Sequence, residues 1–272
     1  MLAVLIELFS YKFIVRAVIV GALVAVCAAL LGVSLVLKRY SMIGDGLAHV
    51  AFGTLSIAVG LNLSPLHVSI PIVVIAAFFL LRISENSKMK GDAAIALIST
   101  AALAFGIIIT SLTDGINVDV LNYMFGSILS MTESEVYISV TLSIIVLIIF
   151  IIFYNKIFSI TFDEHFAKAT GTKVSTYNTI LAILTAVTIV VGMRIMGTLL
   201  ISSLIVFPVL TSMRVFKSFK AVVMSSALVS VICLFIGIIL SYVFALPTGP
   251  SIVAANFFAF CIFYIIAFII KR

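Results

Sequence analysis

Repeated apolar segments near the length needed to cross a lipid bilayer constrain the fold of this chain more than any other feature. A helix needs roughly 20 consecutive apolar residues to cross the hydrocarbon layer. We predict such segments at 13–37, 44–61, 65–82, 92–112, 135–157, 174–193, 196–214, 219–244 and 250–270. The weakest are 44–61, which carries Asp45 and His49, and 196–214, which Pro208 interrupts. A count of eight spans is therefore the alternative to nine.

The composition agrees with a chain that lives in lipid. Hydrophobic residues make up 64% of the sequence and charged residues only 10%, which a soluble domain of this size does not need. No polar block is long enough for a separate domain, and the N-terminus lacks the layout of a removable signal peptide. We predict one all-α polytopic membrane domain over residues 1–272, with eight or nine transmembrane helices and a short cytoplasmic helix.

Lys and Arg residues divide unevenly between the two sides of the predicted bundle. Those that follow the odd-numbered segments are Lys38, Arg39, Arg82, Lys88, Lys90, Lys156, Lys168, Lys173, Arg214, Lys217, Lys220, Lys271 and Arg272. The other side has only Lys12, Arg16 and Arg194. Because cytoplasmic loops are enriched in Lys and Arg, this pattern predicts a cytoplasmic C-terminus and, with nine spans, an external N-terminus. The charges lie at segment ends and not on one face, so we expect no nucleic-acid partner.

Two connecting stretches are more than simple loops. The external stretch 117–132 is apolar but too short to span, which is typical of a re-entrant segment or of a loop packed over helix ends. On the other side, Thr161 and Glu164 have capping-box spacing and Gly171 suits the position after a helix end, so we predict a short helix between them. Its apolar stripe would comprise Phe162, Phe166 and Ala169. Such a helix can lie on the bilayer or fill a groove on a cytoplasmic partner.

Asp45 and His49 are the candidate functional pair. On a helix they lie one turn apart on the same face. Ionisable side chains are costly in lipid, so their presence there indicates a functional site. One oxygen and one nitrogen donor suit Mn²⁺, Fe²⁺ or Zn²⁺ better than Ca²⁺ or Mg²⁺. The alternatives are structural hydrogen bonds of Asp45 and His49 with each other and with neighbouring helices, and a proton relay through the imidazole.

Other polar groups in the apolar segments have simpler interpretations. His67 is expected at the membrane interface and His165 in contact with solvent or a partner. Asn178 and Asn256 are expected to make hydrogen bonds between helices, and Pro208 to kink its helix. The cysteines, Cys27, Cys233 and Cys261, stand alone and indicate neither a disulfide framework nor a thiolate metal site.

The sequence contains no phosphate-binding loop and no hydrolase motif. We therefore expect a non-enzyme whose uphill transport would draw energy from a gradient or from a partner. A gradient-driven secondary cation transporter is the main alternative function, although no inverted repeat is visible. An intramembrane metalloenzyme is the other alternative, but it would lack a third ligand in the same segment.

Several stretches, in one register along nearly the whole chain, resemble the membrane subunits of metal-ion ABC importers of the zinc, manganese and iron group. The most specific is KRYSMIGDGLAH at 38–49. The others are FGSIL at 125–129, FDEHFA at 162–167, GTLLISSLIVFP at 197–208 and LPTGPSI at 246–252. Where many members have Pro and then Gly after the His, this chain has Gly53 and Thr54, which puts a proline-dependent helix break there in doubt.

The resemblance implies a homodimeric permease in the plasma membrane, driven by two cytoplasmic ATP-binding subunits and supplied by an extracellular metal-binding protein. It implies that Asp45 and His49 contact the transported ion, with zinc the first expectation and manganese or iron as alternatives, and that no cofactor is bound permanently. It also implies that 162–171 is the ATPase-coupling helix, with Phe162, Asp163, Glu164, Phe166 and Gly171 among its residues.

Overall fold

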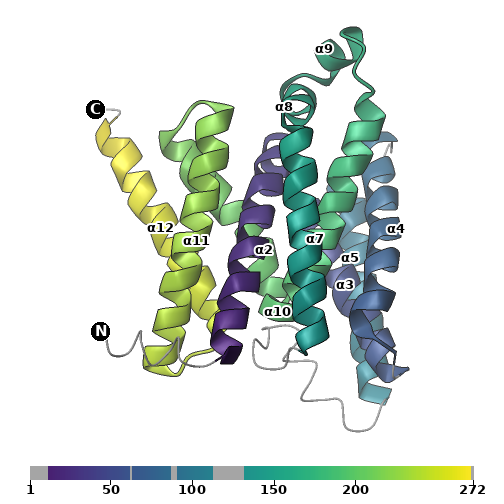
Figure 1. The fold of residues 1–272 in the computed structure, drawn as a ribbon. Helices are drawn as coiled ribbons and strands as arrows, with labels where there is room; N and C mark the ends of the chain where they lie inside the picture. The colour runs from purple at the N-terminus through teal and green to yellow at the C-terminus, as the bar shows by residue number, and fades with distance from the viewer. Residues whose placement is uncertain (1–11, 62, 87–90, 113–131, 271–272) are drawn as a thin grey trace.

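A computed structural model describes residues 12–61, 63–86, 91–112 and 132–270, and these ranges are almost entirely helical. Figure 1 shows the helices as a bundle with most axes roughly parallel. Their bounds are α2 Lys12–Leu37, α3 Ser41–Gly60, α4 Pro65–Asn86, α5 Gly91–Leu112, α7 Glu133–Ile152, α8 Tyr154–Phe162, α9 Glu164–Ala169, α10 Val174–Val215, α11 Phe219–Phe244 and α12 Thr248–Ile270. The predicted external segment at 117–132 falls, except for Thr132, outside the described residues.

The described ranges contain 9 helical segments that are long and apolar enough to cross a membrane. Among the two predicted counts, the structure therefore supports nine. Figure 1 agrees, because α2 begins at one end of the bundle and α12 finishes at the opposite end, as an odd number of crossings requires. The ends of α2, α4, α7 and α12 all lie at the end of the bundle that carries α9 (Figure 1). Basic residues such as Lys38, Arg82 and Lys168 consequently gather there.

The long helix α10 contains two of these segments, Val174–Arg194 and Met196–Val215. They meet at Gly197, whose backbone dihedrals (φ 81°, ψ 165°) are non-helical and fall in a region that side chains with a Cβ atom avoid. The chain reverses direction there, so the two halves run in opposite senses (Figure 1). The reversal therefore falls close to the boundary predicted between segments 174–193 and 196–214, whereas Pro208, where a kink is expected, stays inside the second half with helical dihedrals.

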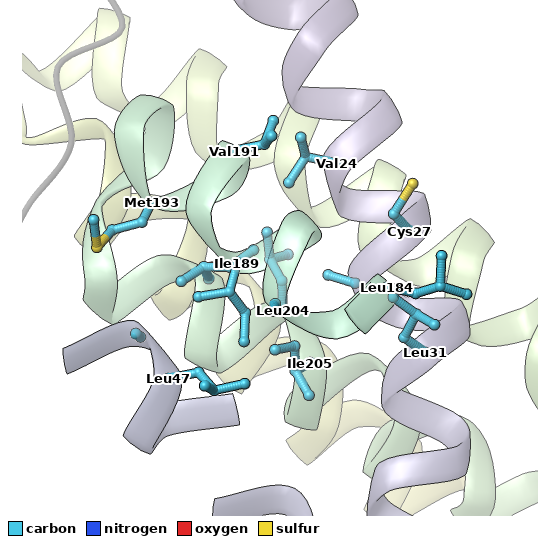
Figure 2. Packing of buried hydrophobic residues seen from close by; sticks show 14 of the residues in the cluster. Val24, Cys27, Leu31, Leu47, Leu184, Ile189, Val191, Met193, Leu204 and Ile205 are labelled. Carbon is cyan, nitrogen blue, oxygen red and sulfur yellow. The ribbon is translucent and has the colours of Figure 1, made fainter. Parts of the chain in front are cut away.

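The core lies where α10 packs between α2 and α3. Figure 2 shows Val24, Cys27 and Leu31 of α2 and Leu47 of α3 approaching residues of α10 such as Leu204. In both α2 and α3, 72% of the most apolar window is buried, compared with 22% in α5, α7 and α12. α2 and α3 are thus central helices, whereas α5, α7 and α12 present more of their surface to the surroundings.

The isolated polar residues of the apolar segments differ in whether they bond to another helix or to their own. Cys27 and Cys233 are buried free thiols that contact the carbonyl oxygens of Ser143 and Ala255. The prediction for Asn256 is wrong, because its amide nitrogen donates to Ile252 O of its own helix rather than to another helix. On a helix, the backbone carbonyl oxygen four residues back lies within reach of an Asn side chain, so its amide can form this hydrogen bond without a neighbouring helix.

Two ion pairs hold the start of α7 at the end of the bundle opposite α9. Glu135 completes a capping box with Thr132 and also accepts a hydrogen bond from Arg194 Nε at 2.9 Å, with side chains only 13% and 12% exposed. Glu133 pairs with Arg16, but these side chains are 71% and 42% exposed. Because Arg194 lies just before the break at Gly197, the shielded pair ties α7 to the point where α10 reverses.

We predict that Glu135→Gln lowers stability, since glutamine can preserve the capping box while removing the charge beside Arg194. A hydrogen bond to a charged group contributes about 1.5–3 kcal/mol, so the unfolding midpoint should fall by several degrees. The chain has no Trp, so circular dichroism of the detergent-solubilised protein is the suitable measurement. Glu133→Gln is the matched control and should change stability by less than about 1 kcal/mol, because its ion pair is exposed. Equal midpoint shifts in the two variants would contradict this assignment.

Candidate functional site

Asp45 and His49 lie on adjacent turns of α3, as the sequence predicts. α3 begins at Ser41, earlier than the predicted segment, so Asp45 is already inside the helix. Asp45 Oδ2 and His49 Nε2 are 3.6 Å apart, and the two side chains are 45% and 24% exposed. The start of α3 lies at the same end of the bundle as α9 (Figure 1), so the pair is nearer to that end than to the opposite one.

The distance between these two atoms is informative. It is too long for a direct hydrogen bond. It is close to the ~3.4 Å that separates two ligand atoms held tetrahedrally at about 2.1 Å from one ion. In addition, His49 Nδ1 is buried and has no hydrogen-bond partner among the described residues. The geometry therefore favours a shared ion over the alternative of a direct Asp–His hydrogen bond.

The pair lies on the one open face of an otherwise enclosed helix. α3 packs against α4, α5 and α10, and its residues facing these helices, such as Leu47 and Phe52, are buried. Met42 shares the open face with Asp45 and His49 and is 46% exposed. Because helical residues three and four apart share a face, these three form a continuous stripe. An ion held there would have access to a second molecule or to water on this side only.

The described part of the chain brings no third ligand of these types to the pair. No group of three or more His, Cys, Asp or Glu side chains with metal-binding geometry exists within the described ranges. His67 is exposed in the first turn of α4, at the opposite end of the bundle, and His165 is exposed on α9. Neither joins the pair, as the sequence predicts. Completion of a coordination shell would therefore require water, backbone or another chain.

Gly53, which stands where many family members have Pro, allows α3 to pack closely against α5. A Cβ atom at this position would lie 2.7 Å from Ala102 O of α5, closer than a methyl group can approach. Gly53 thus lets the two backbones touch, which small residues at membrane helix interfaces permit. α3 continues as an unbroken helix through Gly53 to Gly60.

The short helix on the α9 side is present, but its start differs from the prediction. Asp163 is the N-cap and accepts a hydrogen bond from Phe166 N at 2.9 Å, so the predicted Thr161–Glu164 capping box is wrong. Thr161 instead belongs to α8, where its hydroxyl donates to Ile157 O. Gly171 follows the helix end as predicted, with a positive φ of 81°. The amides of Gly171 and Thr172 close the end in a Schellman motif.

The apolar residues near this helix form two surfaces rather than one stripe. Phe166 is 63% exposed on α9. Phe162 is the last residue of α8, and its ring lies 5.0 Å from Phe158 and 5.9 Å from Phe219 between centroids. The predicted stripe of Phe162, Phe166 and Ala169 is therefore wrong, because a change of direction at Asp163 separates Phe162 from the other two.

Lys38 and Asn178 both contact Glu164 of α9, a partner that the sequence does not identify. Lys38 Nζ lies 2.6 Å from Glu164 Oε1, and Asn178 Nδ2 donates to the same oxygen at 3.2 Å. The prediction of hydrogen bonding between elements is thus confirmed for Asn178. In the sequence, Lys38 serves only as a marker of topology, because no local spacing relates it to Glu164.

Comparison with known proteins places the chain in a family. The profile of the ABC 3 transport family matches residues 10–270. The chain belongs to the ABC 3 transport family. This membership confirms the family resemblance seen in the sequence and, with the nine apolar helices, the polytopic membrane fold.

Relatives in the ABC 3 transport family are similar over almost their whole length. The manganese import system permease protein ScaB of Streptococcus gordonii is 28% identical over 260 residues, covering 96% of this chain and 93% of that protein. The high-affinity zinc uptake system membrane protein ZnuB of Haemophilus influenzae is 28% identical over 251 residues, covering 92% and 96%. The solved structure of PsaBC from Streptococcus pneumoniae in complex with Fab matches with a TM-score of 0.87 and 27% identity, covering 97% and 95%.

Proposed function

We propose that this chain is the membrane-spanning permease subunit of an ATP-driven importer of divalent transition-metal ions. The observation that carries the proposal is the pair of Asp45 Oδ2 and His49 Nε2, 3.6 Å apart on the open face of the buried helix α3. Membership of the ABC 3 transport family and relatives named for manganese import and zinc uptake support it. The donor pair fits Zn²⁺, Mn²⁺ and Fe²⁺, and zinc is the first cargo to test.

The proposed path runs from the end of the bundle opposite α9 to the end that carries it. Basic residues gather at the α9 end, which the positive-inside rule assigns to the cytoplasm together with the C-terminus. An extracellular metal-binding protein delivers the ion, which pauses at Asp45 and His49 and leaves inwards. A site with few ligands is suited to transit, because the ion must both bind and leave.

We also propose that the chain acts as a homodimer around this path. Within the described residues, the site consists of one carboxylate and one imidazole, both on an open face. A second copy related by two-fold symmetry would bring the same stripe to the same place, giving two carboxylates and two imidazoles. Four such ligands are the number that a tetrahedral ion takes.

Metal uptake by reconstituted importer tests the function directly. Proteoliposomes containing the permease, its ATP-binding subunit and its extracellular binding protein should accumulate Zn²⁺, Mn²⁺ or Fe²⁺ only with ATP. Asp45→Ala and His49→Ala should each reduce uptake to below about a tenth of wild type, since even residues that only orient a metal ligand contribute 10–100-fold. Ile145→Ala, at an exposed position of α7 outside this stripe, should retain uptake. Near-normal uptake in both ligand variants would refute the site, and uptake driven by an ion gradient without ATP would favour the secondary transporter.

Phe166 should anchor the ATP-binding subunit. Its ring is the exposed apolar group of α9, and a central aromatic anchor typically contributes 2 kcal/mol or more to an interface. Phe166→Asp should therefore weaken association about 30-fold, measured by co-purification at graded concentrations. Phe166→Leu keeps an apolar side chain and should largely preserve association. A complex of Phe166→Asp that purifies as well as wild type would exclude docking through this face.

A further inference from the structure

Glu164 connects α9 to the membrane-spanning bundle through one carboxylate oxygen, Oε1, while its side chain remains 41% exposed. Its carboxylate pairs with Lys38 Nζ at 2.6 Å and accepts a hydrogen bond from Asn178 Nδ2 at 3.2 Å. Lys38 also donates to Asn178 Oδ1, and its ammonium group lies 5.8 Å from the centroid of the Tyr40 ring. One cluster thus joins α9, the end of α2 and the first turns of α10.

Lys38 depends on this pairing. Its side chain is only 5% exposed and lines a small cavity with Leu35, Ile43 and Leu81. A buried ammonium group without a partner is strongly unfavourable. Burial by itself raises the pKa of Glu164, but the hydrogen bond and charge of Lys38 outweigh it and leave that pKa below its usual value. Glu164 is therefore ionised at neutral pH, and removal of its charge would leave the buried Lys38 side chain with the neutral acceptor Asn178 Oδ1.

The chain directly after Lys38 forms a rigid corner into α3. Arg39 has a positive φ of 61°, and the amides of Arg39 and Tyr40 donate to Val36 O and Leu35 O, which closes the end of α2. Ile43 N then donates to Tyr40 O at 2.9 Å as α3 begins. Because the corner is hydrogen-bonded throughout, a displacement of Lys38 is passed to the first turns of α3. Those turns carry Asp45 and His49.

We propose that the Lys38–Glu164 ion pair transmits movement of α9 to the metal-binding turns of α3. The inference rests on the proposed function, because it requires that a partner moves α9. Lys38 and Glu164 are positioning residues and do not contact the ion. When the ATP-binding subunits shift α9, Glu164 carries the buried Lys38 with it, and the α2–α3 corner follows. Asn178 holds the same cluster to α10, which packs along the other side of α3.

The first test needs no partner protein. Glu164→Gln removes the charge that holds Lys38, so the corner should loosen in the permease alone. Hydrogen–deuterium exchange in detergent should become about tenfold faster in peptides covering 38–48. Lys156→Gln is the matched control, because it removes an exposed cation at the same end of the bundle and should leave this exchange unchanged. Unchanged exchange in Glu164→Gln would show that the Lys38–Glu164 ion pair does not hold the α2–α3 corner.

The second test separates coupling from assembly in the reconstituted importer. Glu164→Gln and Lys38→Met should still assemble and hydrolyse ATP, but uptake of Mn²⁺ per ATP hydrolysed should fall about tenfold, the usual size of a coupling between sites. The charge-swapped double variant, Lys38→Glu with Glu164→Lys, should recover part of this ratio, because it restores the ion pair that each single variant removes.

The outcomes distinguish the inference from the function on which it rests. Normal wild-type uptake with an unchanged ratio in both single variants would overturn the coupling and leave the proposed function intact. Loss of assembly in the single variants and in the charge swap would assign the pair to folding or docking instead. Absence of ATP-driven uptake by wild-type importer would overturn the proposed function, and the exchange measurement would still report whether the pair secures the corner.

Discussion

Close backbone contact between helices is the constraint on which the arrangement depends. Lipid gives helices little hydrophobic reason to associate, so small residues that let backbones touch determine which surfaces meet. A Cβ atom at Gly32 of α2 would lie 2.2 Å from Ile205 O of α10, and one at Gly53 of α3 would lie 2.7 Å from Ala102 O of α5. The neighbours α4, α5 and α10 pack around α3. They leave the stripe with Asp45 and His49 as its open face.

The features that the sequence predicts correctly depend on local pattern. Apolar length and basic ends give the nine spans, and a spacing of four places Asp45 beside His49 on any helix. Features that depend on tertiary packing or on competing local bonds are missed. The Lys38–Glu164 pair, for example, joins distant segments. The N-cap is misplaced because Thr161 and Asp163 are both able to cap, and only the structure shows Thr161 bonded within α8.

Charged groups outside the open stripe have structural roles at the two ends of the bundle. Glu135 and Arg194 secure the reversal of α10 at one end, whereas Lys38 and Glu164 secure the α2–α3 corner at the other. α10 takes part in both, and it packs along α3 between them. In the proposed function, an ion pausing at Asp45 and His49 would thus be held by a helix whose start is joined to α9 through Lys38 and Glu164 and whose side packs against α10. This arrangement connects the proposed docking surface to the proposed metal site through a few named contacts.

The number of ions bound per chain tests the central claim most directly. Mn²⁺ titration of the purified, assembled importer, followed by electron paramagnetic resonance of the free ion, counts bound metal. If Asp45 and His49 of two copies share one ion, wild type should bind one more ion per pair of permease chains than the Asp45→Ala/His49→Ala double variant. Equal binding by wild type and double variant, or a difference of one ion for every chain, would contradict a shared transit site.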